Sequence, residues 1–116
     1  MEVLERTRPY EEFVAVVEAV VRRLQAEGIA ALVRIQFYAH SNSTEVGALL
    51  TFSDRNQIMQ HIQMITDWEE FRQFFQTVKP LDVRTYGKLS EEAEAWIRQF
   101  DVVSKTFEEH VAGFVR

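Results

Sequence analysis

The chain has 116 residues, of which 47% are hydrophobic, and a formal net charge of −5 from 18 acidic and 13 basic residues. This length and hydrophobic content predict one domain over residues 1–116 with a single core. The absence of cysteine excludes disulfides, thiolate catalysis and Cys-based metal sites.

Charge and hydropathy also limit the classes of binding partner that the sequence favours. The acidic balance, with no Lys/Arg cluster beyond Arg22-Arg23, disfavours nucleic-acid binding. No apolar run approaches the roughly 18 residues of a membrane helix, and the N-terminus does not resemble a signal peptide. We therefore expect a cytoplasmic protein, away from membranes, whose partners are small molecules or proteins.

The first predicted elements are a weak strand over residues 3–8 and a clear helix over residues 9–27. Pro9 suits the first helical turn, and Gly28 supplies a left-handed C-cap. Hydrophobic residues recur along the helix every three or four positions, which predicts one buried face. These residues are Phe13, Val16, Val17, Val20 and Leu24.

The hydrophobic period changes to two between Ala30 and Phe52, and the polar residues 40–44 predict a hairpin loop. Centring the loop on Asn42 and Ser43 fixes the register, because a slip of one residue would scramble both faces. The predicted apolar pairs are Ala39–Val46, Phe37–Ala48, Ile35–Leu50 and Val33–Phe52. The predicted polar pairs are His40–Glu45, Tyr38–Gly47, Gln36–Leu49 and Arg34–Thr51.

A second helical stretch is predicted from a cap at Ser53 to residue 78. Thr66 and Glu69 have capping-box spacing, so we expect two helical pieces or a kink there. After Pro80, alternation over residues 81–86 predicts a strand. Leu81, Val83 and Thr85 would face the core, and Asp82, Arg84 and Tyr86 would face away from it.

Ser90 is predicted to cap a further helix that runs through Phe100. Residues 101–116 are compatible with helix or strand. Thr106 and Glu109 repeat the capping-box spacing, whereas the segment from Phe107 to residue 115 alternates and contains Gly113. On balance the pattern favours a helix.

The predicted order over residues 2–88 is βαββαβ, the ferredoxin-like arrangement of an antiparallel sheet with its helices on one face. Residues 89–116 form a C-terminal extension of a helix and a tail. The other sheet face carries Leu32, Leu49 and several aromatic residues among its polar groups. We expect a homodimer that stacks sheet on sheet and covers this face.

This order of elements resembles the dimeric α+β barrel superfamily, and is similar to its small antibiotic-biosynthesis-monooxygenase-like members. The resemblance rests on the hairpin over residues 32–52, the helix from Ser53 and the strand that ends Val83-Arg84-Thr85-Tyr86-Gly87. It implies a cavity between or beneath two sheets, used in such proteins for cofactor-independent oxidation, isomerisation, haem chemistry or no known chemistry. Because one fold hosts several functions, the resemblance does not fix the activity.

The predicted polar face supplies the candidate ligand-binding residues, Arg34, Gln36, Arg84 and Tyr86. The two guanidinium groups could hold a carboxylate or polarise a carbonyl, because each offers a planar fork of donors. Alternatively, Arg34, Asp82 and Arg84 only form ion pairs across the sheet or the dimer interface.

The candidate catalytic residues are His40 and Tyr38. A carboxylate opposite His40, that of Glu45, would orient the imidazole to accept a proton. Gly47 opposite Tyr38 leaves room for the aromatic ring or for a ligand. His40 adjoins a hairpin tip, where side chains are usually solvated, and simple packing of Tyr38 on Gly47 is the competing interpretation.

Other polar and sulfur-containing residues are interpreted as structural. His61 is taken as a surface or satisfied core residue, and Met59, Met64 and Trp68 as packing residues. No two histidines lie three or four residues apart, so we expect neither a metal nor a cofactor. The chain also lacks a Gly-rich phosphate loop and a Gly-x-Ser-x-Gly motif, which disfavours nucleotide and serine hydrolysis.

Three functions stay open at this point. One is a cofactor-independent monooxygenase or isomerase acting on a small polar or aromatic molecule. In it, His40 or Tyr38 would act as the base, and Arg34, Gln36 or Arg84 would stabilise charge. The second is a non-catalytic protein that binds a small ligand in the same pocket. The third is a structural homodimer whose polar sheet face is an interface.

Overall fold

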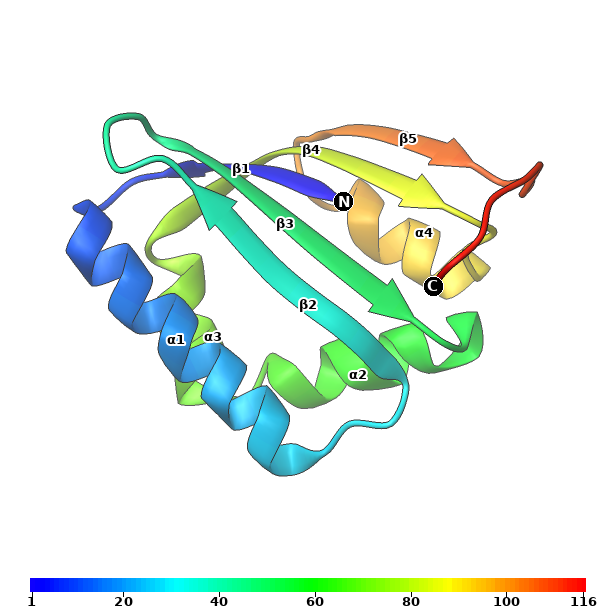
Figure 1. Ribbon diagram of the computed structural model, residues 1–116, viewed down its shortest axis with the longest axis horizontal. Helices are drawn as coiled ribbons and strands as arrows, with labels where there is room; N and C mark the ends of the chain where they lie inside the picture. Colours follow the sequence, from blue (N-terminus) through cyan, green and yellow to red (C-terminus); the bar gives the residue numbers. More distant parts are fainter.

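Five strands form one open sheet in the computed structural model, which describes all of residues 1–116 (Figure 1). The strands are β1 Glu2–Arg6, β2 Leu32–Ala39, β3 Glu45–Phe52, β4 Val78–Tyr86 and β5 Val103–Phe107. The helices are α1 Tyr10–Glu27, the 3-10 turn η1 Arg55–Gln57, α2 Ile58–Ile65, α3 Glu69–Phe75 and α4 Glu91–Arg98. The fold class is α+β.

The strand order is β2-β3-β1-β4-β5, and the first four strands are antiparallel to their neighbours. This order is compatible with a ferredoxin-like fold. The chain departs from a strict βαββαβ order because its second connection contains η1, α2 and α3, and because α4 and β5 are added at the edge. The sheet is not closed into a barrel.

The hairpin register confirms most of the predicted pairs. Six of them, from Ala39–Val46 to Arg34–Thr51, are strand partners. The pair Val33–Phe52 is wrong, because the register shifts at Val33 and Leu32 pairs with Phe52 instead. The extra residue is a β-bulge, and it leaves Val33 64% exposed.

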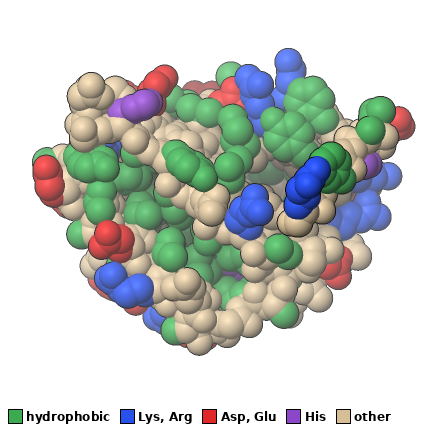
Figure 2. Space-filling model, viewed as in Figure 1, with side chains coloured by type: hydrophobic (Ala, Val, Ile, Leu, Met, Phe, Trp, Pro, Cys, Tyr) green, Lys and Arg blue, Asp and Glu red, His purple; other side chains and the backbone are tan.

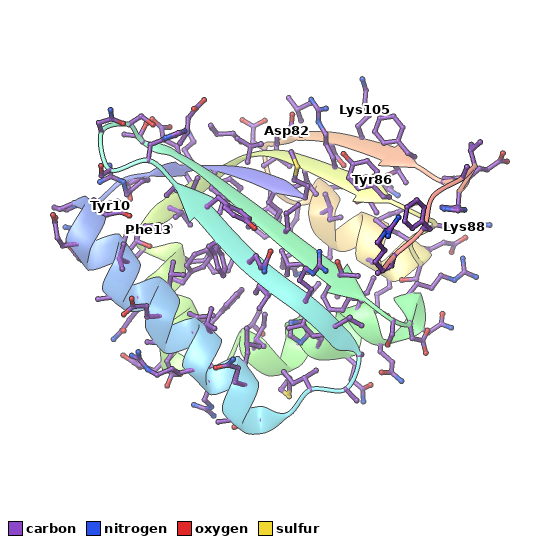
Figure 3. All side chains as sticks on the ribbon, viewed as in Figure 1. Tyr10, Phe13, Asp82, Tyr86, Lys88 and Lys105 are labelled. Carbon is purple, nitrogen blue, oxygen red and sulfur yellow. The ribbon has the colours of Figure 1, made fainter.

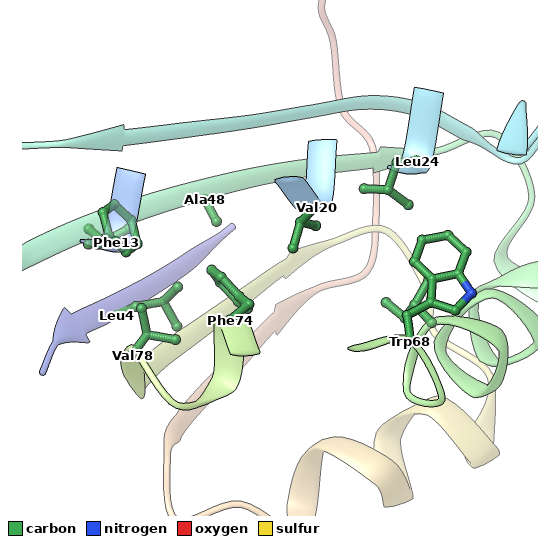
Figure 4. Close-up of a cluster of buried hydrophobic side chains, with 10 residues drawn as sticks. Leu4, Phe13, Val20, Leu24, Ala48, Trp68, Phe74 and Val78 are labelled. Atoms are coloured by element: carbon green, nitrogen blue, oxygen red, sulfur yellow. The ribbon is translucent and has the colours of Figure 1, made fainter. Parts of the chain in front are cut away.

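The core lies between α1, α3 and the sheet, as Figure 4 shows. Helix α1 follows Pro9 and ends at Gly28, whose φ of 62° is the predicted left-handed cap. From α1, Phe13, Val20 and Leu24 pack against buried residues of the sheet and of α3. The remaining core side chains are Leu4, Val46, Ala48, Ile65, Trp68, Phe74 and Val78.

The predicted break in the second helical stretch is present between α2 and α3, but its capping chemistry differs. The Thr66 hydroxyl donates to the Gln63 carbonyl (3.0 Å), so Thr66 ends α2 and does not begin α3. The predicted cap at Ser53 is also replaced: the Asp54 carboxylate accepts from the Asn56 backbone N–H (2.9 Å).

Strand β4 begins earlier than predicted and contains a second bulge. Val3 pairs with Asp82 and Leu4 with Pro80, so Leu81 is an extra residue with no partner on β1. Its side chain is 39% exposed, which corrects the prediction that Leu81 faces the core. Val83 and Thr85 are half-buried, in agreement with the predicted alternation beyond the bulge.

Helix α4 has the predicted cap, because the Ser90 hydroxyl oxygen accepts from the Ala93 backbone N–H (3.2 Å). The predicted helix over residues 101–116 is wrong. β5 pairs in parallel with β4, with α4 as the crossover, and residues 108–116 have no regular structure. Stacking of Tyr86 on Phe107 (centroids 5.6 Å apart) contributes to this pairing.

None of the helices combines the length and the hydropathy that crossing a bilayer would require.

Candidate functional site

A cavity of about 690 Å³ lies between the core face of the sheet and helices α2, α3 and α4. Of its 34 lining residues, 24 are hydrophobic, so a bound molecule would be surrounded mainly by apolar side chains. The volume is in the range of pockets that enclose small ligands and cofactors. The aromatic part of the lining consists of Phe37, Phe52, Trp68, Phe71, Phe74, Phe75, Tyr86, Trp96 and Phe100.

The cavity lining extends to the start of β1, where it includes Met1 and Glu2. β1 pairs with β3 only as far as Ala48 and with β4 only as far as Val83. Beyond these positions, β3 continues through residues 49–52 and β4 through residues 84–86 with no further strand of the sheet between them, although Met1 still exchanges two backbone hydrogen bonds with Arg84 (2.7 Å each). We call this opening the strand gap.

Residues on the outer face at the strand gap line the cavity. The neighbours of Leu49, Thr51 and Arg84 along the strands face the core, so these three side chains face the outer side of the sheet. All three nevertheless belong to the lining. The lining therefore includes residues from both faces of the sheet in this region. On the face seen in Figure 2, hydrophobic side chains form the floor of a hollow, with basic side chains beside it.

His61 of α2 is a polar group deep in the cavity wall. Its side chain is 4% exposed, and neither Nδ1 nor Nε2 has a hydrogen-bond partner. The Phe52 ring packs edge-on against it (centroids 5.3 Å apart). Burial lowers the pKa of His61, so its imidazole is neutral near pH 7, with one nitrogen able to accept a proton.

Glu2 of β1 is the one acidic residue of the lining. It alternates with buried Leu4 and therefore faces the core side of the sheet. Burial raises the pKa of its carboxyl, and the charge of the neighbouring amino group of Met1 opposes this effect in part. A carboxyl with a raised pKa keeps its proton to higher pH and can then donate a hydrogen bond.

Some of the residues predicted for the site line the cavity in the structure, and others do not. Arg34, Arg84 and Tyr86 line the cavity, and Figure 3 shows Tyr86 at the end of β4, near Lys88. Gln36, Tyr38 and His40 are not part of the lining.

Tyr38 and His40 lie on the surface, away from the cavity. Tyr38 is 58% exposed and donates to the Gln36 side-chain carbonyl (2.8 Å). His40 follows the last residue of β2, so it forms no strand pair with Glu45. The predicted ion pair is present for Arg84, whose Nε lies 3.5 Å from the Asp82 carboxylate, whereas Arg34 has none.

Sequence reasoning missed His61 and Glu2, although each carries a periodic signal. His61 is three residues after Ile58 and four before Ile65, so it lies on the same apolar stripe of α2. Glu2 lies two residues before Leu4 on β1 and therefore faces the same side of the sheet. A polar residue at an apolar position of an otherwise regular stripe is the signal that would have identified both.

No group of three or more His, Asp or Glu side chains has an arrangement that could hold a metal ion. Comparison of the chain with protein-family models, with curated proteins and with solved structures gives no match. The geometry of the cavity therefore carries the functional argument.

Proposed function

We propose that this protein binds a small, mostly apolar molecule in the cavity and transfers a proton on it through His61. The observation that carries the proposal is an imidazole that is 4% exposed, has two unpartnered nitrogens and lines a cavity. A buried polar group without a partner costs about 1–3 kcal/mol. A ligand that hydrogen bonds to His61 would recover part of this cost.

The chemistry follows from the two perturbed groups. The neutral imidazole of His61 accepts a proton from an acidic C–H or O–H bond of the substrate, and the electron pair stays on the substrate as an enolate or phenolate. While it keeps its proton, the carboxyl of Glu2, whose pKa is raised by burial, would donate a hydrogen bond to the developing oxyanion. Such an anion can regain the proton at another atom or react with dioxygen, as in isomerases and cofactor-independent monooxygenases.

Ligand binding is tested first with N-phenyl-1-naphthylamine, an uncharged fluorescent molecule. We expect its emission to rise on binding and to be excited through tryptophan, because Trp68 and Trp96 both line the cavity. Ala93→Phe, which fills part of the cavity, should weaken binding. The same change at Ala112, in the exposed tail, is the matched control.

Proton transfer is tested on the molecule that native mass spectrometry finds retained by the purified protein. His61→Gln keeps a polar side chain but removes the base, so kcat should fall about a hundredfold or more. His40→Gln, at the hairpin tip, should leave kcat unchanged. Binding without any turnover would favour a non-catalytic binding protein.

A homodimer that stacks the outer sheet faces is a second part of the proposal. The observation in its favour is a set of large hydrophobic side chains exposed on strands of the sheet. The set consists of Val33, Tyr38, Leu49, Leu81, Tyr86, Val103 and Phe107. A monomer rarely leaves so much apolar surface uncovered. If the dimer forms, its partner sheet would face the strand gap and limit access to the cavity.

A further inference from the structure

We infer that the ligand of the cavity is an amphiphilic carboxylate, with its apolar body inside the cavity and its anionic end among Arg34, Arg55, Arg84 and Lys88. We call these four residues the cationic rim. The inference rests on the proposed binding function and adds the charge of the ligand to it.

The first argument is the uneven distribution of charge. The chain carries 18 acidic and 13 basic residues, so an average surface would be acidic. The cavity lining has the reverse balance, with four of the basic residues and one acidic residue, Glu2. Burial raises the pKa of the Glu2 carboxyl, so this group loses its proton less readily than an exposed glutamate does. A lining with this excess of positive charge attracts anions.

The second argument is where the cationic rim lies in the fold. Arg34 is the strand partner of Thr51, which borders the strand gap, and Arg84 borders the gap on its other side. Arg55 and Lys88 follow the ends of β3 and β4. All four cations therefore come from the segments around the opening, whereas the buried aromatic side chains of the lining, Trp68 and Phe74, lie within. Charge at the mouth and apolar surface inside match an amphiphile.

The third argument is that few of the positive charges of the cationic rim are paired with acidic side chains. Among its four members, only Arg84 has an ion-pair partner, Asp82, at 3.5 Å. Outside the lining, Arg22, Arg23, Arg72 and Arg98 pair with glutamates on the helices, whereas the three arginines nearest the chain ends, Arg6, Arg8 and Arg116, have no ion-pair partner. Guanidinium groups bind carboxylates through planar, charge-assisted hydrogen bonds, so the two unpaired arginines of the rim, Arg34 and Arg55, are suited to such a ligand.

The test compares two pairs of probes that differ only in charge: naphthalene-2-carboxylate with naphthalene-2-carboxamide, and decanoate with decanamide. Titration calorimetry at pH 7.5 should give at least tenfold tighter binding of each carboxylate. Arg34→Gln and Arg84→Gln should each lower carboxylate affinity about tenfold, the effect of losing a charge-assisted hydrogen bond, and leave carboxamide affinity unchanged. Raising NaCl to 0.5 M should weaken only the carboxylates, by screening.

Arg72→Gln is the matched control, because Arg72 is exposed on α3 and is not part of the lining. It should change none of the affinities. Equal binding of acid and amide, or loss of both in the Arg34 and Arg84 variants, would overturn the inference. The proposed function fails separately, if N-phenyl-1-naphthylamine and all four probes fail to bind.

Discussion

At the scale of single residues, the site combines two groups whose burial works against the stability of the fold. His61 and Glu2 occupy positions where apolar side chains would pack without loss of hydration. Active and binding sites often retain such groups at a cost in stability, because their chemistry depends on them. Replacing either residue by an uncharged analogue should therefore stabilise the empty protein.

For His61 the expected change is a gain in stability that grows at acid pH. At pH 7.5, His61→Leu should raise the free energy of unfolding by about 1 kcal/mol, because no buried nitrogen is left without a partner. Below the ordinary histidine pKa of 6.5, the unfolded imidazole takes up a proton that the folded one resists. The wild-type protein then loses stability as pH falls, and the variant loses less.

Urea denaturation at pH 7.5 and pH 5.5 measures both effects. His40→Leu, on the surface, is the control and should show neither. A variant less stable than the wild type at pH 7.5 would mean that His61 has a stabilising partner, such as a buried water.

Glu2 has the opposite pH dependence. Its folded-state pKa is raised above the ordinary value of 4.5, so wild-type stability falls as pH rises from 4.5 through the folded pKa. Glu2→Gln has no charge to desolvate and should be more stable than the wild type at pH 7. The difference should vanish below pH 4.5. Thermal unfolding at both pH values tests this, and a difference that persists at low pH would refute the assigned cause.

Which residues face the core was largely predictable, and Arg34, Arg84 and Tyr86 of the cavity lining were predicted, whereas the roles of His61 and Glu2 were not. Alternation assigned Phe37, Ala48 and Leu50 correctly, because burial of apolar surface decides the face of a strand. It cannot show that His61 lacks a hydrogen-bond partner, since that depends on which polar groups other elements bring near. The two arguments for Tyr38 and His40 used only strand neighbours and did not include the cavity beneath the sheet.

At the scale of elements, local capping is a measurable part of the fold. The Ser90 hydroxyl satisfies the Ala93 backbone N–H at the start of α4, the helix that connects β4 with β5 and closes one side of the cavity. Ser90→Ala should lower the free energy of unfolding by about 1 kcal/mol. Ser104→Ala, at an exposed position of β5, should change it by less than about 0.5 kcal/mol. Equal effects in urea denaturation would contradict a capping role.

The wrong predictions of strand register and of β5 share a physical cause. The bulges at Val33 and Leu81 depend on how a strand matches its neighbour, and the neighbour is not encoded in the local period. The same holds for β5. Its five residues become a strand because the edge of β4 is free to pair, although the local pattern also suits a helix.

At the scale of the whole molecule, the uncovered sheet face sets an expectation for assembly. We expect light scattering at micromolar concentration to give about twice the chain mass of 13.6 kDa. Tyr38→Glu, which places charge on the outer face without touching the cavity, should return the mass to that of one chain. Val115→Glu in the exposed tail should not. A single-chain mass for the wild type would exclude the stacked dimer.

The cavity itself was beyond prediction from the sequence. Periodicity indicates which side chains face inward, but the space left among α2, α3, α4 and the sheet depends on the angles and lengths of all four. The short β1 adds the strand gap, and nothing in its own five residues indicates that β3 and β4 extend beyond it.

The central position of β1 also affects the order in which the molecule can assemble during synthesis. β1 is the first strand made, yet its partners are residues 45–48 and 78–83. The β2–β3 hairpin, with its short loop, can form as soon as it leaves the ribosome, and β1 can then join its edge. The middle of the sheet is completed only when β4 has emerged, so the nascent chain carries an unpaired strand edge for much of its translation.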